Sequence, residues 1–273
     1  RNGRDHHACG PDTAEAVKSC ASSGEMRSEE YRAMFELEDR LWWYEGMRAV
    51  TASLLDKDLS GRTGLSVLDV GCGTGYSLSW IKERFEAEAA FGVDSSKEAA
   101  RLWKERGIDS AAIASVDCLP FGPSQFDLVT CFDVVYQLDE EGVRRALSEM
   151  HRVLKPGGLL FIREPAYQWL RGSHDLAVGT RHRFTLKEMS AIIRSLGFSR
   201  KRATYANTLL FWAAVPHRIL TRLTGGSSSD VKPVSEWMNS AFSSVLKFES
   251  RLLERMSFPF GLSVILLAEK RHI

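Results

Sequence analysis

Three glycines and one acidic residue in the first third of the chain have the spacing of a ligand-binding loop. Asp69 ends an apolar run, and Gly71, Gly73 and Gly75 alternate with small residues directly after it, with Cys72 inside the loop. Because glycine has no Cβ, its backbone can enter tight turns and approach a ligand closely. A buried strand followed by a glycine loop and a helix commonly binds a nucleoside-containing cofactor. We therefore predict a cofactor site at this loop.

A nicotinamide dehydrogenase is an alternative for any glycine loop of this kind. The dinucleotide fingerprint G-x-G-x-x-G needs its third glycine one position later than this chain has it, and Tyr76 fills that position. The carboxylate of Asp69, two residues before the loop, would also repel a diphosphate. The spacing therefore disfavours a dinucleotide.

Further acidic residues follow the next apolar runs. Asp94 ends the second run, where a carboxylate can accept hydrogen bonds from both hydroxyls of a ribose. Asp117 follows a third, short run (111–114), and we expect it to accept from the exocyclic amine of an adenine. A fourth run covers 126–132. The same segments add further residues to the predicted cofactor pocket: Ser95, Cys118, Phe132 and Asp133.

A fifth segment, Val153–Ile162, reads as a helix end, a Pro-Gly-Gly turn and another strand. In order and spacing, the five segments resemble the class I S-adenosylmethionine-dependent methyltransferases, over about residues 38–200. The resemblance implies an α/β fold with a Rossmann-like, seven-stranded, mostly parallel sheet and helices on both faces. It also implies S-adenosyl-L-methionine as the cofactor.

The rest of the chain is assigned around this core. We expect a disordered or expression-derived tail at 1–25 and an N-terminal helical segment over the cofactor site at 26–60. The cofactor-binding core follows at 61–206, a helical insertion between strands six and seven at 207–257, and the last strand at 258–273. The apolar insertion is interpreted as a lid or acceptor wall, a homodimer contact, simple packing on the domain or a membrane-surface patch. We expect cofactor binding to survive without it.

The segment Glu38–Arg48 resembles a tryptophan-rich entry segment in one subset of these methyltransferases. The resemblance places Trp43 or Tyr44 over the methionine end of the cofactor, where an aromatic face attracts the sulfonium cation. Arg48 would pair with the methionine carboxylate. The alternative is that Trp42 and Trp43 pack a helix on the sheet.

A general base helps methyl transfer when the acceptor is a hydroxyl or a protonated amine. The candidates are Glu164, at the end of strand five, and His174 and His182, in the long loop after it. Many such enzymes carry a histidine where this chain has Gln137. The segment after strand four also lacks an Asn-Pro-Pro-Tyr-like element, which counts against methylation of nucleic-acid bases.

Composition narrows the partners. The net charge of +1 gives no electrostatic signature of nucleic-acid binding, and the five cysteines show neither C-x-x-C pairing nor metal-ligand spacing. We expect no metal, no integral membrane contact and a cytoplasmic location. The leading hypothesis is methyl transfer to a small or lipid-like, possibly apolar acceptor. The alternative is a cofactor-binding regulatory or partner subunit without transfer activity.

Overall fold

A computed structural model of the chain describes residues 26, 28–172, 175, 178–216 and 234–271. The predicted tail at 1–25 and most of the stretch joining the two parts of the insertion lie outside these residues. The strands are β1 (Ser66–Val70), β2 (Ala89–Asp94), β3 (Ala111–Ile113), β4 (Phe126–Phe132), β5 (Leu154–Pro165), β6 (Phe198–Ala206) and β7 (Ser263–Lys270). The described helices are α2 (Ser28–Leu37), α3 (Trp42–Leu59), α4 (Tyr76–Arg84), α5 (Lys97–Arg106), α6 (Glu140–Val153), α8 (Leu186–Ser195) and α10 (Glu236–Leu253), with short 3-10 turns η1 (Val135–Gln137) and η2 (Gln168–Leu170).

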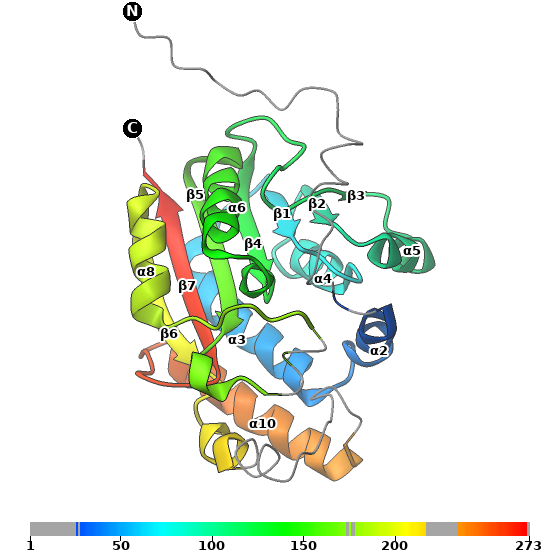
Figure 1. Ribbon diagram of the computed structural model, residues 1–273, viewed down its shortest axis with the longest axis vertical. Helices are drawn as coiled ribbons and strands as arrows, with labels where there is room; N and C mark the ends of the chain where they lie inside the picture. The colour runs from blue at the N-terminus through cyan, green and yellow to red at the C-terminus, as the bar shows by residue number, and fades with distance from the viewer. Residues whose placement is uncertain (1–25, 27, 173–174, 176–177, 217–233, 272–273) are drawn as a thin grey trace, which may run out of the picture.

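The strands form one seven-stranded sheet in the order β3-β2-β1-β4-β5-β7-β6 (Figure 1). The pairs among β1 to β5 are parallel, whereas β7 is antiparallel to both β5 and β6. The order reverses direction at β1 and β4, which is where open α/β sheets bind ligands. The predicted fold class, including a helical insertion between strands six and seven, is confirmed.

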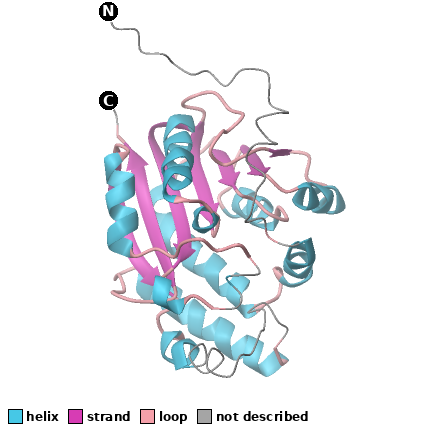
Figure 2. Cartoon of the chain, in the orientation of Figure 1, coloured by secondary structure: helices cyan, strands magenta, loops and turns pink. Residues whose placement is uncertain are grey.

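Side chains alternate between the two faces of the sheet, and each face has its own apolar core. Leu160 and Ile162 point toward a cluster that contains residues of α6 and α8, whereas Leu159 and Phe161 point toward one that contains residues of α3 and α4. Successive strand residues face opposite sides, so a run that is apolar throughout is buried on both faces. Figure 2 shows helices on both sides of the sheet.

The helix boundaries follow local capping chemistry. Thr185 and Glu188 form a capping box at the start of α8, and Gly197, after its end, has a φ of 92°. Ser96 accepts from two amides of the first turn of α5 and caps the start of this helix. The N-terminal helical segment predicted at 26–60 consists of two helices, α2 and α3, because the chain turns between them.

The insertion contributes α10, which lies along α3 (Figure 1). Trp42 and Phe242 meet edge to face at 5.2 Å between ring centroids, and Glu45 accepts from Ser243 and Lys247. The insertion is therefore packed on the N-terminal segment in the folded chain.

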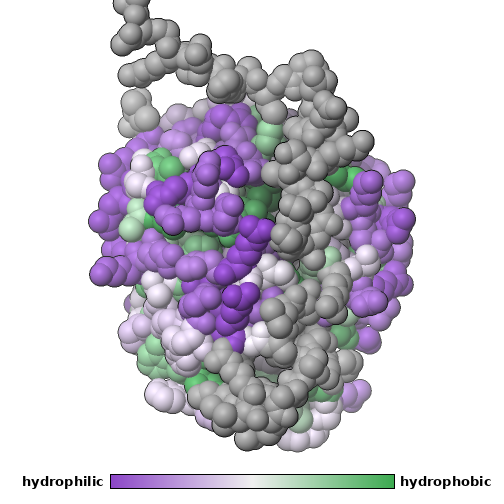
Figure 3. Space-filling model, viewed as in Figure 1, coloured by the Kyte–Doolittle hydropathy of each residue, from purple (hydrophilic) through white to green (hydrophobic). Residues whose placement is uncertain are grey.

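The outer surface over α6 and α8 is largely hydrophilic in Figure 3, as expected for helices whose apolar stripes face the sheet. Among the described residues, no helix combines the length and apolar character needed to cross a bilayer.

Candidate functional site

The glycine loop joins β1 to α4 with three left-handed glycines, whose φ values are 75° at Gly71, 52° at Gly73 and 85° at Gly75. A Cβ at Gly71 would lie 2.3 Å from Val134, and one at Gly75 would lie 2.4 Å from Ile108. A Cβ at Gly73 would meet nothing closer than 3.8 Å. The outer glycines are therefore required by packing against the protein, and Gly73 leaves open space beside its backbone.

Asp94 ties the loop to the end of β2. One carboxylate oxygen accepts from the Gly73 amide at 2.9 Å, and the other accepts from the Ser96 amide at 2.9 Å and the Tyr31 hydroxyl at 3.2 Å. Burial raises the pKa of Asp94, and the hydrogen bonds oppose that shift. Asp94 therefore lies where a carboxylate grips a ribose, but a side chain from α2 already contacts it.

Asp69 lies at the neighbouring strand end and is 1% exposed. One carboxylate oxygen accepts from Thr130 Oγ1 at 2.7 Å, and the other is buried without a hydrogen-bond partner. Burial raises the pKa of Asp69 to about 7, while the Thr130 hydrogen bond and the Arg163 cation act in the opposite direction. A buried carboxylate oxygen without a donor is well suited to an incoming ammonium group.

Arg163, on β5, lies beside the end of β4. Its guanidinium binds Asp133 at 2.5 and 2.9 Å and lies 5.0 Å from the ring centroid of Trp43 and 4.9 Å from that of Phe132. Asp133 has a φ of 56°. The rings predicted to contact the cofactor therefore already contact a cation of the protein. Tyr44 packs edge to face on Trp43, and burial raises its pKa.

The turn before α3 forms a second polar cluster, which sequence reasoning missed. The buried Glu38 accepts from Thr74 in the glycine loop and from Arg106 on α5. Arg48 donates to the main-chain oxygens of Glu38 and Asp39, at 2.6 and 3.2 Å. Arg48 is thus engaged with this turn, and its pairing with a methionine carboxylate stays a prediction. The tryptophan-rich segment begins at Glu38, but the sequence indicated no role for this residue, because its partners lie far away in the chain.

The remaining predicted cofactor residues lie at the ends of β2 and β3. Asp117 accepts from Ser115 and from Arg145 Nε, the latter at 3.3 Å. Ser95 and Cys118 are exposed. Asp117 is therefore partly used within the protein, and its contact with an adenine amine stays a prediction.

The three candidate bases have different surroundings. Glu164 is fully buried and accepts from the amides of η1 and the residue before it, and burial holds its pKa well above its usual range. These contacts fix the chain after β4, so we do not retain Glu164 as a base. His182 is partly exposed, with Nε2 2.8 Å from Glu188 Oε1. His174 lies outside the described residues.

Six aromatic side chains gather where β5 and β6 end and β7 begins. Tyr167 stacks on Tyr205 and Trp169, with centroid distances of 5.1 and 5.7 Å, and Phe211 extends the cluster. Trp169 is 52% exposed and Trp212 is 71% exposed. The members of this aromatic cluster are Tyr167, Trp169, Tyr205, Phe211, Trp212 and Phe260.

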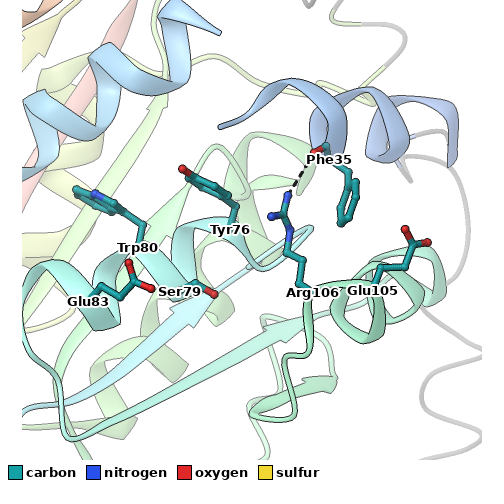
Figure 4. Close-up of a pocket in the computed structure, with 7 residues that line it drawn as sticks. All are labelled: Phe35, Tyr76, Ser79, Trp80, Glu83, Glu105 and Arg106. Atoms are coloured by element: carbon teal, nitrogen blue, oxygen red, sulfur yellow. Dashed lines mark hydrogen bonds between the residues drawn. The ribbon is translucent and has the colours of Figure 1, made fainter. Parts of the chain in front are cut away.

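A separate cleft of about 380 Å³ lies on the outer side of α4 (Figure 4). It is lined by Phe35, Tyr76, Ser79, Trp80, Glu83, Glu105 and Arg106. In Figure 4, Arg106 reaches up toward Phe35, whose main-chain oxygen it binds at 3.3 Å. Neither Asp69 nor Asp94 lines this cleft, so it is distinct from the strand-edge site.

Comparison with known proteins identifies the central segment. Residues 68–162 match the family model described as a methyltransferase domain. The chain is 26% identical over 177 residues to malonyl-acyl-carrier protein O-methyltransferase 1 of Coxiella burnetii, which covers 63% of this chain and 61% of that protein. It is 33% identical over 123 residues to the ubiquinone/menaquinone biosynthesis C-methyltransferase UbiE of Laribacter hongkongensis, which covers 42% of this chain and 50% of the relative. The chain thus spans about half to three fifths of the length of these curated relatives.

Solved structures share the fold. A Haloferax volcanii complex between the Trm112 methyltransferase activator and a methyltransferase matches with a TM-score of 0.57 at 20% identity, covering 90% of this chain and 95% of that one. At such low identity the likeness concerns the fold alone. The matched domain at 68–162, the strand order and the glycine loop between two buried carboxylates together identify this part of the chain as a methyltransferase domain with the fold of the class I, S-adenosylmethionine-dependent enzymes.

Proposed function

We propose that this protein binds S-adenosylmethionine across the carboxyl ends of β2, β1 and β4 and transfers its methyl group to a small-molecule acceptor. The observation that carries the proposal is the pair of buried carboxylates flanking the glycine loop. Asp94 is assigned to the ribose, and the unpartnered oxygen of Asp69 to the methionine ammonium group. The open space beside Gly73 leaves room for the ligand to approach the backbone.

The cofactor, when bound, supplies an electrophilic methyl carbon on a positively charged sulfur. The protein's part is to align an acceptor with that carbon and to exclude water. We assign the exclusion of water to the N-terminal segment, α2 and α3. Its Trp43 shares the Arg163 guanidinium with Phe132 at the end of β4, and Tyr44 packs on Trp43. Because Trp43 already contacts the Arg163 guanidinium, its ring face is suited to a cation.

We assign the acceptor to the side of the aromatic cluster, beyond the end of β5. Its large exposed rings, Trp169 and Trp212, favour an apolar or aromatic acceptor over a highly charged one. The name of one curated relative, a ubiquinone/menaquinone biosynthesis C-methyltransferase, supports an apolar acceptor. His182 is retained as the candidate base, because its main-chain amide donates to the main-chain oxygen of Tyr136 at 3.0 Å. This hydrogen bond holds His182 beside the segment that follows β4.

Two measurements on the full chain test the proposal. Calorimetry with S-adenosylhomocysteine tests cofactor binding, and transfer of a radiolabelled methyl group into fractionated cell extracts tests catalysis. We expect both to succeed. Binding with no transfer into any fraction would favour the regulatory-subunit alternative, and no binding would overturn the proposal.

The ribose assignment has its own variant. Asp94→Ala should weaken S-adenosylhomocysteine binding by roughly 1–3 kcal/mol, because the ribose hydroxyls lose their acceptor. Asp127→Ala is the matched control, since Asp127 pairs with Lys155 at the opposite, amino end of β4. Equal losses in the two variants would contradict the assignment.

A further inference from the structure

We propose that Tyr31 is a built-in competitor for the ribose-binding carboxylate, so that α2 must release Asp94 before a nucleoside can be gripped by both hydroxyls. The inference rests on the proposed function, which assigns Asp94 to the ribose. Its structural basis is the hydrogen bond from the Tyr31 hydroxyl to Asp94 Oδ1, at 3.2 Å. The phenol thus occupies an acceptor position of the kind that a ribose hydroxyl uses.

A count of acceptor positions shows why the two cannot coexist. An ionised carboxylate offers about four lone-pair sites. The Gly73 and Ser96 amides and the Tyr31 hydroxyl together fill three of them, and the Ser95 amide adds a weaker contact. At most one site remains, whereas two ribose hydroxyls need two. A two-hydroxyl grip therefore requires the phenol to leave.

The rest of α2 holds the phenol in place. Tyr31 is 7% exposed and packs with Cys72, in the glycine loop, and with Leu102 and Trp103 of α5. On the outer side of the helix, Arg32 pairs with Glu105 at 2.8 Å. These contacts do not involve a ligand, so the closed arrangement is stable by itself.

A second residue of α2 faces the same space. The methyl carbon of Met34 is the nearest atom to a Cβ built on Gly73, at 3.8 Å. Helix α2 therefore contacts the site at two places. Met34 lies beside the open side of the glycine loop, and Tyr31 binds the Asp94 carboxylate.

The competition lowers the apparent affinity for the cofactor. When only a fraction of molecules is competent to bind, the apparent Kd rises by the inverse of that fraction. Removing the phenolic oxygen, while keeping the ring in its apolar cluster, should raise the competent fraction. The effect should depend on the ribose hydroxyls of the ligand, since only they compete for the vacated position.

The test is Tyr31→Phe in the full chain, with binding measured by calorimetry. We expect S-adenosylhomocysteine to bind about tenfold more tightly than to the unaltered protein, the order of one hydrogen bond to a charged group. Ser195→Ala is the control, because it also removes a hydroxyl, but one that donates to the Ile192 oxygen at the end of α8, away from the site. It should leave the affinity unchanged.

A pair of smaller ligands sharpens the result. Tyr31→Phe should tighten the binding of adenosine and leave that of 2′,3′-dideoxyadenosine unchanged. If the unaltered protein binds S-adenosylhomocysteine and Tyr31→Phe binds it equally or less well, the competition is overturned while the proposed function stands. If neither protein binds it, the proposed function fails together with this inference.

Discussion

Leu246 of α10 lies directly against Gly46 of α3: a Cβ at residue 46 would lie 2.4 Å from Leu246 Cδ1 and 2.5 Å from its Cβ. Gly46 is two residues from Tyr44 and three from Trp43. The insertion therefore meets the N-terminal segment at the place where that segment carries its candidate cofactor residues. The contact ties an element late in the chain to the position of an early one.

The close approach predicts that residue 46 does not tolerate a side chain. Gly46→Val should lower the free energy of unfolding by about 1–3 kcal/mol, because the added methyl groups force α10 away from α3. Urea unfolding measures the change. Gly172→Ala is the control, since among the described residues a Cβ there would meet only Asp175 Oδ2, at 4.0 Å. Equal stabilities of the two variants would show that α10 can move away from α3 without a loss of stability.

A second contact in this interface predicts an effect on the cofactor site. Leu41, at the start of α3, makes no capping hydrogen bond, and Asn239 of α10 takes that role by accepting from the Trp42 amide at 2.8 Å. Asn239→Ala should cost about 1 kcal/mol of stability. It should also weaken S-adenosylhomocysteine binding severalfold, because the first turn of α3 carries Trp43 and Tyr44.

Asn239→Asp separates capping from general damage to α10. Its carboxylate can still accept from the Trp42 amide but cannot donate to the Arg40 oxygen, which Asn239 does at 2.8 Å. We expect it to restore most of the ligand affinity lost in Asn239→Ala. Calorimetry decides, and an affinity as low as that of the alanine variant would contradict the capping role.

These contacts also show why part of the site was predictable from sequence and part was not. Asp69 and Asp94 each end an apolar run, and parallel strands bring such ends to one edge, so their proximity follows from local pattern. The bond between Tyr31 and Asp94 joins residues 63 positions apart, and that between Trp42 and Asn239 spans 197. Such pairings depend on how helices pack on the finished sheet, which periodicity does not specify.

The insertion gives the same lesson. Its helical character and its place between the last two strands followed from the apolar pattern, and α10 has both. We expected cofactor binding to survive without the insertion. Nothing in the sequence indicated that Leu246 of α10 packs against Gly46 of α3, next to the candidate cofactor residues. A deletion of 207–257 would uncover this face of α3, so the point variants above are the sharper test.

Asp69 predicts a characteristic pH dependence of stability. In an unfolded chain an aspartate ionises near pH 4, roughly, whereas burial raises the pKa of Asp69 to about 7 in the folded protein. Between these values the folded state holds a proton that the unfolded state lacks. Stability from this group is thus complete below about pH 4 and is lost as the pH rises through about 7, with a slope approaching 1.4 kcal/mol per pH unit.

Asp69→Asn isolates this contribution, because the amide oxygen can still accept from Thr130 and does not titrate. The difference in unfolding free energy between the unaltered protein and the variant should shift in favour of the variant as the pH rises from 5 to 8. Urea unfolding at several pH values measures it. A difference that stays constant over this range would show that Asp69 ionises as an ordinary aspartate.

The aromatic cluster predicts a loss of transfer without a loss of cofactor binding. Trp169→Ala removes an exposed ring that stacks on Tyr167, so an apolar acceptor would lose contact area while Asp69 and Asp94 stay intact. We expect at least a tenfold decrease in radiolabelled methyl transfer into the responsive extract fraction, and unchanged S-adenosylhomocysteine affinity. Trp237→Ala is the control, because Trp237 is a comparably large exposed ring on α10, 73% exposed, outside the cluster. Should both variants transfer methyl groups at the unaltered rate, the acceptor must bind elsewhere along the strand edge.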